Sequence, residues 1–426
     1  MPRRAFFGYR TSSSASSPGD AIRLAHVVEG SGAEAAGLRP DDVIVHIDGA
    51  RRPLDRRTML HAIRSRQPGD VLTVSFRRNS GPVQTVDVTL GEFPTTDFTV
   101  GGRLHYLAAE VPDVPGPSGP ALVRLLLLRP VDLEGDDIVT PSPLVAFVSS
   151  MQCRSLDEAA LSTSPVGIEF SYAGGLLARG FAVLMVDRPG LGDSQGPPCE
   201  SLDWDQERAV YLAALHRIVR DPRIDPGRVA LLGFGTGGYH AARLAHASQL
   251  DAATGGPMPP IRALVAVGVD DRPWTDYAKA LLTRIRYPLP ASEQMLGTPP
   301  RVALTEEEID AHLEVHLAVA NAGLTTRELY AQRPGLRRTG YPSSGGFVAG
   351  RGPGYFQRLQ QMNAVGLFAR VTAPKLFARN EDDNASFAEA LERLGMATGG
   401  EWLSSSSSTE DVATWLAAEL GMPEPR

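Results

Sequence analysis

Two patterns of apolar residues divide the chain. Within the first ninety or so residues, the apolar residues from Leu54 to Arg66 have helical spacing. Short strand-like runs also occur there, and most of them are followed by glycine. These runs lie at Ile22–Val28, Asp42–Ile47, Val71–Arg77 and Gln84–Leu90. From Phe98 onward, near-continuous apolar runs alternate with helical stretches, which predicts buried parallel strands and crossover helices on both faces of a sheet. Those runs lie at 121–128, 143–150, 181–187, 229–235, 263–269 and 375–379.

The alternation of strands and helices breaks down between Asp270 and Val371. This part of the chain contains helical stretches such as Glu306–Ala320 and turns rich in glycine and proline at Pro334–Gly354. An insertion of about a hundred residues before the last strands is long for a connection in a compact domain. We therefore expect a helical lid at about 272–368, over the carboxyl edge of the sheet.

Composition and charge narrow the classes of function. The chain has 426 residues, 42% of them apolar, and a formal charge of −7 at pH 7. This length allows two domains, and the charge argues against nucleic-acid binding through a broad basic surface. The sequence shows no signal peptide or membrane span, so we expect a cytoplasmic protein without membrane partners. Cys153 and Cys199 lie in different loops, and we expect a reducing compartment and no disulfide.

The N-terminal segment resembles a PDZ domain of the bacterial, protease-associated type. The resemblance rests on FFGYR, VVEGSGAEAAGLRPDDVIVHIDG, HAIRSRQPGDVLTVSFRR and VQTVDVTLGE. It implies a domain over residues 1–94 that adds a peptide C-terminus to a strand edge. The peptide carboxylate would meet backbone N–H groups of Phe7, Gly8 and Tyr9, because glycine lets the backbone approach an anion. The alternative is a blocked groove and a domain that serves only for packing.

Residues 95–426 resemble the α/β-hydrolase fold, particularly its acyl-peptidase and dienelactone-hydrolase-like branches. The resemblance rests on YAGGLLARGFAVLMVDRPGLGDSQGPPC, RDPRIDPGRVALLGFGTGGYHAARLA and RVTAPKLFARNEDD. It implies an α/β protein whose mostly parallel sheet carries helices on both faces and a helical lid, preceded by the small PDZ domain.

Two members of the expected catalytic triad are missing. A hydrolase of this fold needs a nucleophile, an acid and a histidine in that chain order. The resemblance places the nucleophile at Gly235, the acid at Asp383 or Asp382, and the histidine in a loop that reads Ser404–Ser408. The last histidine of the chain is His316. Because glycine tolerates the strained backbone of this turn, we expect a retained nucleophile elbow that has lost covalent hydrolysis.

The backbone N–H groups of an oxyanion hole do not require the nucleophile. The resemblance places one of them at Thr236 and a second at Met151 or Gln152, in the loop SSMQC. These N–H groups could bind an oxyanion or a carbonyl oxygen without a covalent intermediate. The hydroxyl of Thr236 would point away from the apex of the turn and has no histidine to activate it.

Apolar and sulfur side chains could line the pocket above this turn. The candidates are Trp274, Tyr277, Tyr355 and Phe356, together with Cys153 next to the oxyanion loop. Cys153 could be reactive only with a cation or base beside it, and the alternative is a thiol packed under the loop.

Carboxylates and histidines supply the candidate acids and bases. Asp383 has lost the imidazole it would orient, and Asp193 and Asp271 follow strands at the edge where open α/β sheets bind ligands. The alternative for each is a turn or capping residue. His312 and His316 have the i, i+4 spacing of metal ligands, but no third ligand lies near in sequence, so we expect no metal. They could serve as a general base if the lid folds them inward.

Three functions fit these features. The first is a non-hydrolytic enzyme of the lyase, dehydratase, isomerase or cyclase type, which uses the pocket and oxyanion amides without a covalent intermediate. The second is a non-catalytic pseudo-hydrolase that binds a small molecule or acyl chain, or a PDZ scaffold. The third is an esterase or peptidase with an unrecognised nucleophile. No cofactor is implied, because the GFGTGG match to a dinucleotide fingerprint falls on the elbow.

Overall fold

The computed structural model divides into two compact units, of which the first comprises Met1–Thr95 and Gly340–Gly346 and the second the remainder of the chain. It describes residues 3–11, 22–49, 58–59, 62–63, 65–93, 101–132, 138, 140–153, 155–156, 168–254, 256, 258–285, 303–341, 348, 350–379, 387–403 and 408–422. None of the helices within these ranges combines the length and the hydropathy that a membrane span requires.

The first unit is built on a five-stranded antiparallel sheet. Its strands lie in the order β2 (Tyr9–Thr11), β3 (Ile22–Val27), β4 (Val43–Ile47), β5 (Val71–Arg77) and β6 (Val83–Thr89). The short strands β1 (Ala5–Phe6) and β7 (Gly91–Glu92) pair with each other, and α1 (Gly32–Ala35) follows β3. Of the helix expected at Leu54–Arg66, only residues 58–59 and 62–63 are described, and they are helical.

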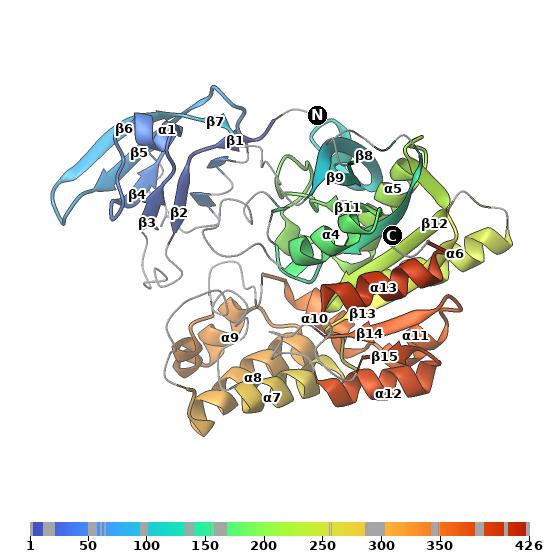
Figure 1. Ribbon diagram of the computed structural model, residues 1–426. Coiled ribbons are helices and arrows are strands. Elements are labelled where there is room, and N and C mark those ends of the chain that lie inside the picture. The colour runs from blue at the N-terminus through green and yellow to red at the C-terminus, as the bar shows by residue number, and fades with distance from the viewer. Residues whose placement is uncertain are drawn as a thin grey trace. The chain divides into compact units, whose positions relative to one another are not determined.

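The second unit contains an eight-stranded sheet (Figure 1). Its strands lie in the order β15 (Glu401–Trp402), β14 (Lys375–Ala378), β13 (Ile261–Val267), β12 (Ile224–Phe234), β10 (Ser142–Val148), β11 (Ala182–Val186), β9 (Gly119–Pro130) and β8 (Gly102–Gly116). The pairs β8–β9 and β9–β11 are antiparallel, and the other pairs are parallel. The sheet is therefore mostly parallel, as the apolar runs predict.

Helices cover both faces of this sheet, because successive residues of a strand point to opposite faces. Val145, Phe147 and Leu232 face a core that contains residues of α4 (Ile168–Ala178) and α13 (Thr409–Glu419). Ala146 and Leu231 lie with residues of α5 (Trp204–Ile218) and α6 (Thr236–Ala253). At the β14–β15 end of the sheet, α12 (Ala388–Thr398) contacts both strands.

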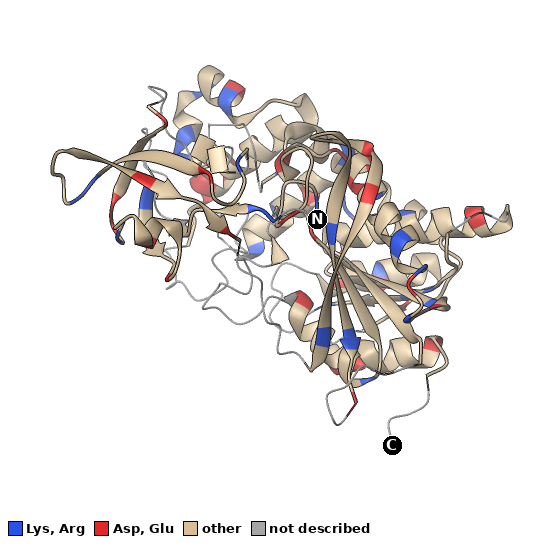
Figure 2. Cartoon of the chain, turned by 90° about the horizontal axis from the view of Figure 1, so that it is seen from above, with Lys and Arg blue, Asp and Glu red and all other residues tan. Residues whose placement is uncertain are grey.

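The expected insertion lies between β13 and β14 and is helical. It contains α7 (Trp274–Ile285), α8 (Glu306–Ala322), α9 (Thr326–Gln332), the 3₁₀ helix η3 (Pro334–Thr339), α10 (Pro353–Gln360) and α11 (Ala364–Ala369). Helix α8 starts with a capping box between Thr305 and Glu308 and ends at Gly323 in the left-handed conformation. It contacts α7 and α10. Acidic and basic residues are interspersed over the described elements (Figure 2).

Candidate functional site

The turn from β12 to α6 has the backbone of an elbow and no side chain at its apex. Gly235 adopts φ 50° and ψ −122°, a conformation that residues with a Cβ atom rarely adopt. Its N–H donates to the carbonyl oxygen of Val267 at 2.8 Å. Two residues later, a Cβ on Gly237 would lie 2.0 Å from the carbonyl oxygen of Val148, so the helix packs against β10 only with glycine there.

Ser150 occupies the edge of the space that a nucleophile would fill. A Cβ built on Gly235 would lie 2.8 Å from Ser150 Oγ. Gly235 and Ser150 are both only half-buried, so the apex keeps some contact with solvent. No sequence motif marks Ser150, although it lies in the loop SSMQC.

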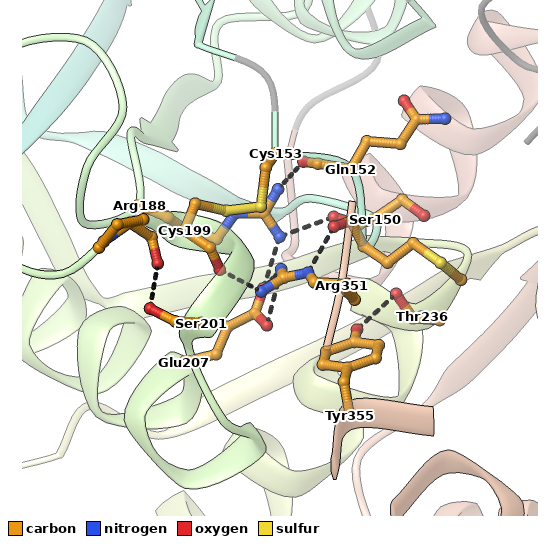
Figure 3. Close-up of a disulfide and its surroundings, with 12 residues drawn as sticks. Ser150, Gln152, Cys153, Arg188, Cys199, Ser201, Glu207, Thr236, Arg351 and Tyr355 are labelled. Atoms are coloured by element: carbon orange, nitrogen blue, oxygen red, sulfur yellow. Dashed lines mark hydrogen bonds and ion pairs between the residues drawn. A yellow bond between two sulfur atoms is a disulfide. The ribbon is translucent and has the colours of Figure 1, made fainter. Parts of the chain in front are cut away.

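Tyr355 of α10 occupies the hydroxyl group of Thr236. Thr236 is 6% exposed, and its Oγ1 accepts a hydrogen bond from Tyr355 Oη at 3.0 Å (Figure 3). Burial raises the pKa of Tyr355, so this tyrosine stays neutral. Thr236 therefore contributes its backbone to the elbow, while its side chain ties the elbow to α10.

Two buried arginines hold the carbonyl groups of the expected oxyanion loop. Arg188 donates to the carbonyl oxygen of Ser150 at 2.7 Å and to that of Gln152 (Figure 3). Arg351 donates to the carbonyl oxygen of Met151 at 2.6 Å. The backbone of residues 150–152 is thus held by two guanidinium groups, one from the loop after β11 and one from the segment before α10.

Glu207 of α5 bridges the two arginines. Its carboxylate accepts from Arg188 at 2.5 Å and from Arg351 at 3.0 Å on each oxygen. Glu207 and Arg351 are 0% exposed and Arg188 is 2% exposed. Burial alone would raise the pKa of Glu207, but Arg351 and Arg188 lower it to about 2. The carboxylate is therefore ionised and compensates one of two buried positive charges.

His240 of α6 lies beside this cluster as a neutral ring. Its Nε2 is 3.6 Å from Glu207 Oε2, and its ring stacks on Trp204 with centroids 4.0 Å apart. Burial lowers the pKa of His240 to about 3, although Glu207 opposes the shift. His240 is 0% exposed and is therefore part of the buried cluster.

The expectation of unpaired cysteines is wrong. Cys153 and Cys199 form a disulfide, with Cα atoms 5.7 Å apart. Arg351 brings the two loops together, because it donates to the carbonyl oxygen of Cys199 at 2.9 Å as well as to Met151. The two cysteines lie 46 residues apart in the sequence, and no motif indicates that they are in contact. Cys153 is therefore neither a free packing thiol nor a reactive one, and the argument for a reducing compartment loses its basis.

The candidate carboxylates are paired with arginines where they are described. Asp193 Oδ2 lies 3.6 Å from Arg124 Nη1, with both side chains buried. Asp271 accepts two hydrogen bonds from Arg393 of α12, each at 2.7 Å. Asp383 lies outside the described residues, as do Asp382 and most of the Ser404–Ser408 loop.

The candidate histidines His312 and His316 are buried residues of α8. His312 and His316 share the buried side of α8 with Ile309 and Val319, at helical spacing. Burial lowers the pKa of His312 to about 4, and burial with the neighbouring His312 lowers that of His316 to about 3. Both rings are neutral at pH 7. Among the described residues, no three His, Cys, Asp or Glu side chains converge as metal ligands.

The aromatic candidates pack on one another. Trp274 lies 5.0 Å from Phe356 and 5.7 Å from Tyr277 between ring centroids, and Tyr355 lies 5.8 Å from Phe356. Trp274, Tyr355 and Phe356 are at most 5% exposed. Trp274 also meets the ring of His316 at 5.6 Å. These side chains join α7, α8 and α10 into one apolar cluster.

The loop expected to bind a peptide carboxylate, Phe7–Tyr9, lies near the start of the first unit. Gly8 has φ 95°, and a Cβ there would lie 2.0 Å from Ser31 Cβ. The carbonyl oxygens of Phe7 and Gly8 accept from Ala33 and Val28 at 3.0 and 2.9 Å. Phe7 is buried, and its ring meets that of Tyr9 at 5.4 Å between centroids. The loop is thus anchored through its carbonyl groups.

Comparison with known proteins identifies both units. The profile of the PDZ domain matches residues 8–90, and that of the alpha/beta hydrolase family matches residues 165–403, more than half of the chain. No curated protein matches the sequence significantly.

Solved structures with a similar fold are distant in sequence. DcsB, solved with its substrate analogue, is 15% identical, with TM-score 0.44, over 75% of this chain and 98% of its own. The alpha/beta hydrolase GrgF from Penicillium sp. sh18 is 16% identical, with TM-score 0.44, over 75% and 98%. The acylaminoacyl peptidase of Pyrococcus horikoshii is 11% identical, with TM-score 0.40, over 94% of this chain and 53% of its own. Similarity at this level says nothing about activity.

Proposed function

The chain belongs to the alpha/beta hydrolase family and carries an N-terminal PDZ domain, and on this basis we propose that its hydrolase domain binds a ligand without hydrolysing it. The observation that carries the proposal is the apex of the elbow. Gly235 has kept the backbone geometry of a nucleophile position and has no side chain that could attack a substrate. Covalent catalysis requires such a nucleophile within reach of a base.

The surroundings of the candidate acids and bases favour binding over catalysis. Asp193 and Asp271 are engaged by Arg124 and Arg393. The pKa of His316 is lowered by burial to about 3, which makes its imidazole a poor base at neutral pH. The second candidate, a lyase, dehydratase, isomerase or cyclase, would need an acid or base from outside the described residues, and Asp383 is the carboxylate to test.

Reaction with a fluorophosphonate and with p-nitrophenyl esters tests the loss of hydrolysis. We expect neither covalent labelling nor turnover by the purified full-length protein. The variants Ser150→Ala and Thr236→Ala remove the two hydroxyl groups nearest the apex. Labelling of the unaltered protein that disappears in one of these variants would overturn the proposal and identify the nucleophile.

The PDZ domain is proposed to bind the C-terminus of a partner peptide at Phe7–Tyr9. The support is the anchored loop, in which Gly8 has positive φ, together with the family's mode of peptide addition. A library of fluorescent peptides, each made with a free and an amidated C-terminus, tests the idea by anisotropy. We expect binding only of free C-termini, and equal binding of both forms would contradict the proposal.

The variant Gly8→Ala locates that site, because the new Cβ would overlap Ser31. Gly30→Ala is the matched control. Gly30 also has positive φ, 71°, but a Cβ there meets no atom within 4 Å. We expect Gly8→Ala to abolish peptide binding at a concentration where Gly30→Ala still binds. Circular dichroism of both variants shows whether the domain is folded.

A further inference from the structure

The disulfide joins the loop after β10 to the 3₁₀ helix η1 (Cys199–Ser201). Cys153 lies three residues after Ser150, and a Cβ built on Gly235 would lie 2.8 Å from Ser150 Oγ. The covalent link is therefore attached to the same short loop that contacts the apex of the elbow. Any change in the state of the disulfide acts on backbone next to the candidate site.

The two cysteines differ in their access to solvent. Cys199 is 0% exposed and packs with Leu191 and Leu202, whereas Cys153 is half-buried at the margin of this cluster. Thiol–disulfide exchange begins when a thiolate attacks one of the two sulfur atoms, so access decides which sulfur reacts. A reductant would therefore approach from the side of Cys153 and leave Cys199 as the departing thiol.

Arginines bond to the backbone at both ends of the disulfide. Arg351 donates to the carbonyl oxygen of Cys199 at 2.9 Å (Figure 3). Arg188 donates to the carbonyl oxygen of Gln152, the residue before Cys153. Neither contact involves a sulfur atom, so both can persist when the disulfide is broken. The reduced loops would thus stay anchored to the domain by hydrogen bonds.

The same arginines carry a surplus of positive charge. Glu207 is the one carboxylate within ion-pair distance of Arg188 or Arg351 among the described residues. His240 adds no charge, because burial lowers its pKa to about 3. Nearby arginines stabilise a thiolate, and a more stable thiolate is a better leaving group. The charge of the cluster therefore favours cleavage with Cys199 as the leaving thiolate.

We propose that Cys153–Cys199 is a redox-active disulfide, and that its reduction by a dithiol loosens residues 150–153 without unfolding the domain. A thiolate of the dithiol attacks Cys153 Sγ, the S–S bond breaks, and Cys199 departs as a thiolate. The second thiol of the reductant then attacks the reductant's own sulfur in the mixed disulfide and releases Cys153. Two electrons pass to the cysteines, the dithiol becomes a disulfide, and its two protons pass to the cysteines or the solvent.

This switch would set the mobility of the loop beside the elbow. In the oxidised state a covalent bond and the arginine contacts hold residues 150–153, and in the reduced state only the hydrogen bonds remain. The inference does not depend on the proposed function, because no ligand takes part in it.

Incubation of the full-length protein with dithiothreitol in buffer without denaturant tests the reactivity of the disulfide. Quenching with excess N-ethylmaleimide in urea, followed by intact mass spectrometry, counts the reduced molecules. We expect full reduction while the tryptophan fluorescence still shows a folded hydrolase domain, since all four tryptophans lie beyond the PDZ domain. Reduction only at urea concentrations that unfold this domain would overturn the proposal.

Hydrogen exchange followed by mass spectrometry measures the effect on the loop. We expect the backbone amides of residues 150–153 to exchange at least about tenfold faster after reduction, because local opening then needs no break of a covalent bond. Reoxidation with glutathione disulfide should restore the slow exchange. Strand β12 is the internal reference, because its residues 229–234 are buried. Unchanged exchange in the loop, or equally accelerated exchange in β12, would contradict a local switch.

Two variants of Arg351 test the role of the charge. Arg351→Gln removes the positive charge, whereas Arg351→Lys keeps it and loses only the fork of hydrogen bonds. We expect Arg351→Gln to shift the equilibrium with dithiothreitol at least about tenfold toward the disulfide, because interactions with charged groups are the stronger ones. Arg351→Lys should remain closer to the unaltered protein. Equal equilibria in all three proteins would refute the role of the arginine, and the two measurements on the unaltered protein do not require either variant to fold.

Discussion

Replacement of Glu207 by glutamine tests the buried charge cluster most directly. The substitution keeps the shape of the side chain and removes the one negative charge between Arg188 and Arg351. The pKa of Glu207 falls from an ordinary 4.5 to about 2 in the folded protein. This difference corresponds to about 3 kcal/mol of stability at pH 7, at about 1.4 kcal/mol for each unit. Loss of one partner from a buried pair costs about 3–5 kcal/mol in other proteins.

Urea unfolding followed by tryptophan fluorescence measures the effect in the hydrolase domain alone, because the PDZ domain contains no tryptophan. We expect Glu207→Gln to lower the free energy of unfolding by about 3 kcal/mol. The control is Glu410→Gln, which removes an exposed partner of Arg179 and should cost less than about 1 kcal/mol. Equal stability of the two variants would refute the view that Glu207 neutralises buried positive charge.

Three further predictions concern the same domain. Reduction of Cys153–Cys199, or the double serine variant, should cost about 4 kcal/mol for a loop of this length, measured by urea unfolding with and without dithiothreitol. Lowering the pH from 7 should destabilise the domain. In the unfolded chain His240 and His316 take up a proton near pH 6.5, whereas in the folded protein they do so only near pH 3. Unchanged stability at pH 5 would contradict this prediction. Gly235→Ala should cost about 1–3 kcal/mol through its positive φ, and the loss should persist in a Ser150→Ala background.

The sequence predicts the core of the fold because buried parallel strands have a simple signature. The runs that became β12 and β13 are apolar at nearly every position, since both faces of the sheet are covered. Strand β8 was not predicted. It lies at the edge of the sheet, contains Pro112 and Pro115, and mixes buried, partly buried and exposed residues, so no continuous apolar run marks it.

Only the part of the candidate site that lies in a local sequence motif could be predicted. The glycines of the elbow and the position of Gly235 follow from the turn between a strand and a helix. The charge cluster could not be predicted, because Arg351 lies 144 residues from Glu207 and no pattern in either segment indicates the contact. Arg188 lies two residues after the buried strand β11, and a charged residue so close to a buried strand is a sequence signal that could have pointed toward the cluster.

The hydrogen bonds of Arg351 bear on the rate at which a ligand could enter and leave. Arg351 lies in the insertion between β13 and β14, yet it bonds to Met151, Cys199 and Glu207 in the body of the domain. Any opening of the insertion at this point must expose Glu207 or leave it with a single arginine, and such openings are rare events on the slow end of protein motion. Exchange of a ligand near the elbow would therefore have to proceed through the half-buried surface at Gly235 and Ser150, without opening of the insertion at Arg351.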